Sequence, residues 1–102
     1  MISIGLKVAN HDTGVGIVFN ENDKTKIYNF HEERFNRLKN TIAFPYLSIN
    51  EALKITKLKS IYDADVVVVE ITSLNGIIEK KLLTAYGYNL DKFKNIIFVN
   101  HH

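Results

Sequence analysis

The run Asp65-Val66-Val67-Val68-Val69-Glu70 (DVVVVE, residues 65–70) decides the fold that this sequence predicts. Its four consecutive valines do not alternate with polar residues, so both faces of the strand are expected to be covered. Such a run is typical of a central parallel strand with helices packed against it. A second uninterrupted run, NIIFV at residues 95–99, predicts a last short strand that is also buried.

Three alternating segments precede the valine run and predict an antiparallel meander. Residues 1–9 alternate between large apolar side chains and small or polar ones, so one face of this strand is expected in the core. Residues 15–19 and 24–30 predict the second and third strands. Turn-forming residues at 10–14 and 20–23 join the three strands.

Two helices are expected around the valine run. Ser48 and Glu51 form a capping-box pattern, which predicts a helix from about Ile49 to Lys57. A second helix is expected to start near Ser73 and to end before Gly87, a suitable left-handed C-cap. Its predicted apolar side consists of Leu74, Ile77, Ile78, Leu82 and Ala85.

The order of elements is therefore three antiparallel strands followed by helix, strand, helix and strand. The right-handed crossover rule places the last strands parallel in the same sheet. The predicted fold is α/β, a ribonuclease-H-like half-domain with a mixed five-stranded sheet. It resembles one half of the sugar kinase, actin and Hsp70 superfamily, so residues 1–102 are expected to be a single N-terminal half-domain of a larger protein.

Composition limits the classes of function. The net charge of +2 over 102 residues predicts no nucleic-acid partner, because nucleic-acid binding needs a concentrated basic patch. The chain has no cysteine, which excludes disulfides and thiolate metal sites. No apolar run is long enough to span a membrane, and the first residues do not resemble a secretory signal, so a cytoplasmic location without a membrane partner is expected.

A charged connector, HEERFNRLKNTIAFP at residues 31–45, separates the meander from the first helix. Its ionic side chains are Glu32, Glu33, Arg34, Arg37 and Lys39. Arginine binds phosphate or carboxylate bidentately and lysine binds it as a point charge, so this segment is a candidate binding site. A solvated loop with scattered ion pairs explains the same charges.

The turn His11-Asp12-Thr13-Gly14 is a second candidate. Successive backbone amides of a turn can converge on an anion such as phosphate. Asp and Gly are also what any hairpin turn favours, so a purely structural role stays open. His11 is not needed for a turn, and an imidazole can act as an acid or a base near neutral pH.

Three segments together resemble the O-carbamoyltransferases of nodulation-factor and antibiotic biosynthesis. Residues 32–45 are similar to the family's EERFxRxKxxxxFP signature, and His11-Asp12 stands where the family has a His-Asp pair. Thr13-Gly14 departs from the small residues that are usual there. His101 at the chain end resembles the first metal ligand of the family's HHxxHA motif, although a purification-tag remnant is an alternative explanation.

The resemblance implies transfer of a carbamoyl group from carbamoyl phosphate, through carbamoyl-adenylate, to a hydroxyl of a sugar or antibiotic-like acceptor. It implies ATP and a divalent metal, iron or zinc, as cofactors. This fragment alone is expected to be inactive and to need a second half-domain or another copy of the chain. The implied site residues are His11, Asp12, Glu32 and Glu33 for catalysis, Thr13, Gly14, Arg34, Arg37 and Lys39 for substrate or nucleotide binding, and His101 for the metal.

The residues also bear on two other functions. A nuclease of ribonuclease-H type needs several carboxylates that converge on two metal ions. The first strand has Ser3, Gly5 and Lys7 at its polar positions, and Asp65 and Glu70 alone do not complete such a cluster. The remaining alternative is a nucleotide-binding or scaffold domain of the same fold without catalysis.

Overall fold

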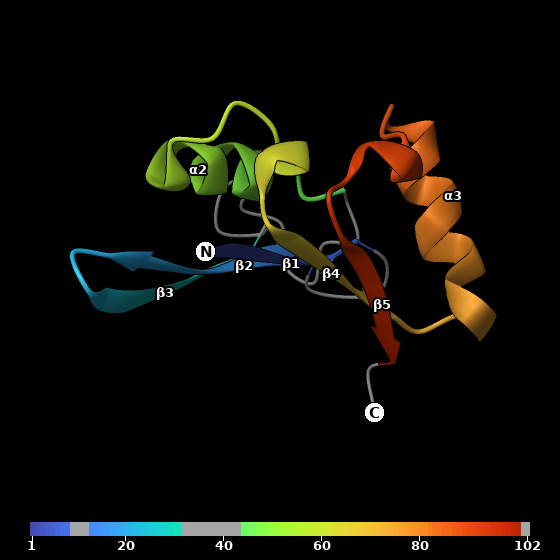
Figure 1. Ribbon diagram of the computed structural model, residues 1–102. Helices are drawn as coiled ribbons and strands as arrows, with labels where there is room; N and C mark the ends of the chain where they lie inside the picture. The colour runs from blue at the N-terminus through green and yellow to red at the C-terminus, as the bar shows by residue number, and fades with distance from the viewer. Residues whose placement is uncertain (9–12, 32–43, 101–102) are drawn as a thin grey trace.

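The computed structural model describes residues 1–8, 13–31 and 44–100 of the chain (Figure 1). None of the helices in these ranges is long and apolar enough to cross a membrane. The regular elements, in chain order, are β1 Ile2–Lys7, β2 Gly14–Glu21, β3 Lys24–His31, α2 Tyr46–Thr56, β4 Val66–Ile71, α3 Ile77–Ala85 and β5 Ile96–Asn100, with short 3-10 turns η1 Ile61–Asp63, η2 Leu74–Gly76 and η3 Leu90–Lys92.

The five strands form one mixed sheet in the order β3-β2-β1-β4-β5. β1, β2 and β3 pair antiparallel, and β4 and β5 continue the sheet parallel to β1. This topology confirms the predicted α/β, ribonuclease-H-like fold. The half-domain status of residues 1–102 stays a prediction.

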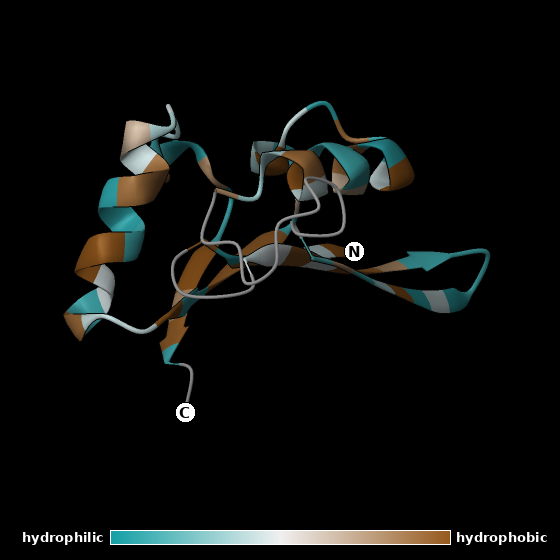
Figure 2. Ribbon diagram, turned by 180° about the vertical axis from the view of Figure 1, so that it is seen from behind, coloured by the Kyte–Doolittle hydropathy of each residue, from teal (hydrophilic) through white to brown (hydrophobic). Residues whose placement is uncertain are grey.

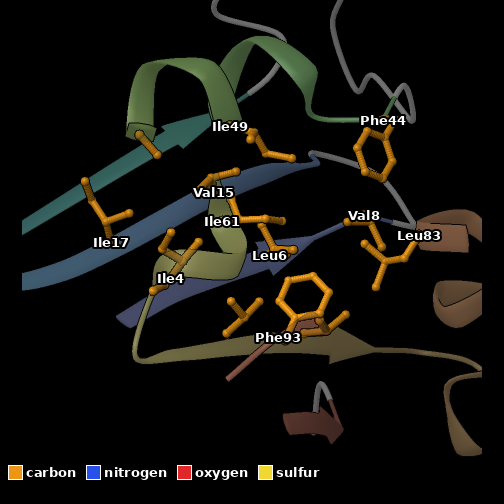
Figure 3. Close-up of a cluster of buried hydrophobic side chains, with 14 of the residues drawn as sticks. Ile4, Leu6, Val8, Val15, Ile17, Phe44, Ile49, Ile61, Leu83 and Phe93 are labelled. Carbon is orange, nitrogen blue, oxygen red and sulfur yellow. The ribbon is translucent and has the colours of Figure 1, made fainter. Parts of the chain in front are cut away.

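The core lies between one face of this sheet and the two helices. Ile4, Leu6 and Val8 are buried there, as the alternation of the first segment predicts. Val15 and Ile17 of β2 lie beside them, and Ile49 of α2 and Leu83 of α3 close the cluster from the helical side (Figure 3). At about 25 cal/mol per Å² of buried apolar surface, this cluster is the main source of the domain's stability.

The valine run is covered on one face rather than two, so this part of the prediction is wrong. Val67 and Val69 are fully buried, whereas Val66 and Val68 are half-buried. The reason is that α2 and α3 both contribute to the same core cluster, on the same side of the sheet (Figure 1). We call the opposite side, with its alternate strand residues, the open face; no helix in the described ranges covers it.

The last strand is likewise less buried than its sequence predicts. β5 is one of the two edge strands of the sheet, and Ile97 and Val99 on the open face are 48% and 41% exposed. Figure 2 shows hydrophobic colouring along β4 and β5 and more hydrophilic colouring towards the tip of the β2–β3 hairpin. An uninterrupted apolar run therefore marks a strand here without marking burial on both sides.

The first helix begins earlier than the capping box predicts. α2 starts at Tyr46 with Pro45 as its N-cap, and the backbone oxygen of Pro45 accepts a hydrogen bond from the amide of Ile49 at 3.0 Å. Ser48 lies inside the helix and is buried, so it does not cap the helix as predicted. Burial of Phe44 and Pro45 fixes where the chain enters the helix, and this packing outweighs the local capping pattern.

The second helix presents a different side to the core than its apolar spacing predicts. Leu74 is 79% exposed, and Ile77 and Ile78 are also exposed. Glu79 and Leu83 are the buried residues of α3. The carboxylate of Glu79 accepts hydrogen bonds from Thr72 and Ser73, directly after β4, and these bonds fix the rotation of the helix. The predicted C-cap is confirmed, because Gly87 has φ of +93°.

Candidate functional site

A pocket of about 610 Å³ lies on the open face, towards the end of the sheet at which β1 and β4 finish. All five strands contribute to it. Its lining residues are Gly5, Leu6, Lys7, Gly14, Val15, Gly16, Asn29, Phe30, His31, Val68, Glu70, Val99 and Asn100.

Three glycines of β1 and β2 form the floor of the pocket. Gly5 pairs with Gly16 and Lys7 pairs with Gly14 across the two strands, so the first of these rows has no side chain on β1 or β2 and the second has only that of Lys7. A Cβ at Gly14 would lie 2.3 Å from the backbone oxygen of Phe30, and one at Gly16 would lie 2.8 Å from Oδ1 of Asn29. Gly14 therefore requires glycine for packing, because the clash is with backbone, whereas a side chain at Gly16 would require only the end of the exposed Asn29 side chain to shift.

Gly5 is different from the other two floor residues. A Cβ there would lie no closer than 3.8 Å to any neighbouring atom, which is an ordinary van der Waals distance. The backbone around Gly5 does not require a glycine, and its missing side chain leaves space on the pocket floor. Glycine in a strand interior costs roughly 0.5–1 kcal/mol relative to alanine, so this empty position lowers stability without any local packing reason.

Polar side chains stand around this floor. Asn29 pairs with Gly16 and His31 pairs with Gly14, so both lie on the open face at the β3 side. Lys7 is half-buried between the two sides. Because Leu6 pairs with Val69 in the parallel register, the next pair along places Lys7 beside Glu70. The pocket thus combines a lysine, a carboxylate, an imidazole and amide groups above a glycine floor.

This arrangement can bind an anionic group but does not by itself form a metal site. Lysine provides three donors on a flexible stem, which suits a phosphate oxygen. In the ranges 1–8, 13–31 and 44–100, no group of three or more His, Asp or Glu side chains lies close enough to hold an ion. The predicted divalent metal therefore has no site among these residues.

A second polar cluster surrounds Glu79 at the start of α3. Its Oε2 accepts a hydrogen bond from the amide of Thr72 at 2.9 Å and one from the Thr72 hydroxyl at 3.2 Å, and its Oε1 accepts from Ser73 Oγ. Ser73 Oγ accepts in turn from the amide of Ile78 at 3.1 Å. Burial raises the pKa of the Glu79 carboxyl, but the bonds from Ser73 and Thr72 outweigh it and leave the pKa below 4.5. This buried carboxylate is ionised and joins β4 to α3.

Most of the sequence-predicted site residues lie outside the described residues. These are His11, Asp12, Glu32, Glu33, Arg34, Arg37, Lys39 and His101. Of the remaining two, Gly14 lines the pocket and Thr13 is fully buried. The roles implied for the hairpin turn, the charged connector and the terminal histidine therefore stay predictions.

Sequence reasoning missed most of the residues that the structure brings together. The period of two places Gly5 and Lys7 on one side of the first strand. In the sequence alone, these positions indicate only that the strand has no acidic group. Asn29 and His31 belong to the same face of the third strand, and Glu70 ends the valine run. The alternation within each strand was the available signal, because alternate residues of paired strands share one face of the sheet.

The comparisons with known proteins give no family. No family model matches the chain, and no curated protein matches it. Among solved structures, the chain is similar to the crystal structure of the fowlpox virus Holliday junction resolvase, with 17% identity and a TM-score of 0.47. The match covers 98% of this chain and 61% of the resolvase chain, so this chain spans less than two thirds of that protein.

These findings contradict the assignment to the O-carbamoyltransferases. No family model and no curated protein of that family matches, and a solved structure to which the chain is similar is named a resolvase, not a transferase. The predicted carbamoyl transfer is therefore wrong, together with its carbamoyl donor, hydroxyl acceptor and ATP-binding role. The expectation that nucleic acid is not a partner is also contradicted. The alternative of a nucleotide-binding or scaffold domain gains no support from the comparisons either.

Proposed function

We propose that this domain binds nucleic acid through the pocket on its open face, with Lys7 contacting a backbone phosphate. The observation that carries this proposal is a half-buried lysine beside a floor of glycines, in a pocket of about 610 Å³. Glycines let a ligand approach the backbone closely, and the lysine supplies a positive charge at the same place. A net charge of +2 does not oppose this, because one contact needs local charge rather than a basic surface.

The shape of the pocket favours a polymer over a small metabolite. Small-molecule sites enclose roughly 70–90% of the ligand surface. Here the pocket lies on a sheet face that no helix in the described ranges covers, and exposed side chains such as Val99 and Asn29 stand at its edges. A chain that continues along the face beyond the pocket uses this geometry better than a compact ligand does.

The described residues favour binding over cleavage. Hydrolysis with two metal ions needs several carboxylates around them. Glu70 is the one acidic residue among the described residues that line the pocket, and Lys7 stands beside it. We therefore propose a nucleic-acid-binding domain and assign no hydrolytic step to these residues.

A divalent cation belongs to this proposal only together with a bound ligand. Mg²⁺ is commonly held by one or two carboxylates plus phosphate oxygens of the ligand. Glu70 fits part of such a set, and a phosphate near Lys7 would supply the rest. Binding of iron or zinc would depend on His101, which lies outside the described residues. The expectation of iron or zinc therefore stays a prediction.

Filling the pocket floor tests the proposal. We expect Gly5→Val to weaken binding of a fluorescent oligonucleotide by about tenfold or more, because the new side chain occupies the space above the floor. The free energy of unfolding should stay equal or rise by about 0.5–1 kcal/mol, since valine favours a strand and its Cβ would lie no closer than 3.8 Å to a backbone atom. Fluorescence anisotropy and urea unfolding measure the two effects.

Val18→Thr is the matched control for this experiment. Val18 lies on the same face of β2, is exposed and does not line the pocket, so this variant should bind as the wild type does. Equal binding by Gly5→Val and the wild type would contradict the proposed site. Added inorganic phosphate that displaces the oligonucleotide at equal ionic strength would indicate recognition of phosphate alone, and would count against a polymer.

A further inference from the structure

We infer that the ligand of this pocket is single-stranded, an inference that rests on the proposed function. All five strands belong to one sheet, so the walls of the pocket are side chains that project from β3 on one side and from β4 and β5 on the other, and its floor is the glycine-rich part of β1 and β2. Three interstrand spacings of about 4.8 Å separate β3 from β4, so the backbones that carry the two walls lie about 14 Å apart. The wall side chains themselves narrow the free width further.

This width does not admit a double helix. The major groove of B-form DNA alone is about 12 Å wide, and a duplex has two backbones and a second groove besides. Duplex DNA is also stiff, with a persistence length of about 50 nm, so it does not bend locally to reach the floor. A single strand has one backbone and turns freely enough to lay a phosphate near Lys7.

The chemistry of the walls points to the same ligand. On the β5 side, Val99 lies next to Glu70 and offers an aliphatic surface, and Val68 lies next to Ile97 in the preceding row. An apolar wall suits the face of an unpaired base, which only a single strand exposes. A duplex would present phosphates to this wall and would desolvate them without a partner. The pocket thus combines one cation for a phosphate with one apolar wall for a base.

Three labelled oligonucleotides test the inference. These are a ten-nucleotide single strand, the duplex of the same sequence and an abasic single strand of the same length. We expect the single strand to bind at least about tenfold more tightly than the duplex, and the abasic strand to lose most of that advantage. A tenfold change in affinity corresponds to about 1.4 kcal/mol.

Val99→Thr supplies the matched variant, because threonine keeps the branched shape and replaces a methyl group by a hydroxyl. Val99→Thr should weaken binding of the normal single strand and leave binding of the abasic strand unchanged. Ile97→Thr is the control on the same strand and face, outside the lining of this pocket. Ile97→Thr should change the affinity for neither oligonucleotide.

The outcomes separate the two claims. Duplex binding that equals or exceeds single-strand binding, and that still depends on Gly5, would overturn the inference and leave the proposed function standing. Binding of none of the three oligonucleotides would overturn the proposed function itself. A Val99→Thr effect that is equal for normal and abasic strands would exclude a base contact at this wall and overturn the inference.

Discussion

Reversal of the charge at Lys7 should reduce nucleic-acid binding more than any other single change in this domain. We expect Lys7→Glu to weaken binding of a single-stranded oligonucleotide by about 30-fold or more. The variant removes a charge-assisted hydrogen bond, worth about 1.5–3 kcal/mol, and adds repulsion between two carboxylates and a phosphate. Fluorescence anisotropy titrations at several salt concentrations measure both the affinity and its salt dependence.

The salt dependence identifies the kind of contact that is lost. Each phosphate contact on a single strand contributes about 0.7 to the slope of log affinity against log salt. Lys7→Ala should lower this slope by about that amount. Lys92→Glu, an exposed lysine of η3 away from the pocket, serves as control and should change affinity only slightly. A Lys7→Ala variant with an unchanged slope would show that Lys7 contacts no phosphate.

Removal of the Glu79 carboxylate should have the largest effect on stability. We expect Glu79→Ala to lower the free energy of unfolding by about 2–3 kcal/mol, because Thr72 and Ser73 lose their buried acceptor. For a domain of this size, this corresponds to a fall in Tm of about 10–20 °C. Thermal unfolding followed by circular dichroism measures the change, and Lys54→Ala at an exposed position of α2 is a suitable control.

The effect of Glu79 should depend on pH with a defined sign. Its pKa in the folded protein is below the ordinary value of 4.5, so its contribution to stability is fully present above pH 4.5 and is lost as the pH falls below that value. Glu79→Gln keeps the shape but removes the titration. Wild type should therefore lose stability relative to Glu79→Gln below pH 4.5. A constant difference between the two proteins from pH 7 to pH 3 would contradict this role.

The strands could be predicted from the sequence because their signal is local. The alternation in residues 1–8 follows directly from which side of the sheet is buried, and Ile4, Leu6 and Val8 are all in the core. The turn between β2 and β3 was equally readable. Asn22 and Asp23 both adopt positive φ there, as a tight two-residue hairpin requires.

The helix faces could not be predicted because they depend on distant contacts. The apolar spacing of α3 favoured Ile77 and Ile78, yet the hydrogen bonds from Thr72 and Ser73 to Glu79 turn another side towards the core. A buried glutamate has no signature in a hydrophobic pattern. The start of α2 shows the same limit, because burial around Pro45 overrode the capping box at Ser48.

The pocket could not be predicted from the sequence for a related reason. Lys7, His31 and Glu70 come from three segments of the sequence, and only the sheet order places them on one face. The valine run suggested a sheet covered on both sides, which left no room for a site on either face. The motif similarity concerns residues 32–45 instead, and the comparisons contradict the family that it suggested.

Mapping of the bound oligonucleotide by NMR tests the central claim most directly. Amide shifts of the ¹⁵N-labelled domain are followed during titration with an unlabelled single strand of ten nucleotides. We predict that the largest shifts occur at Gly5, Lys7, Gly16 and Asn29, with little change at α2 and α3. Shifts centred on the helices, or no shifts at concentrations up to about 1 mM, would contradict binding at the open face.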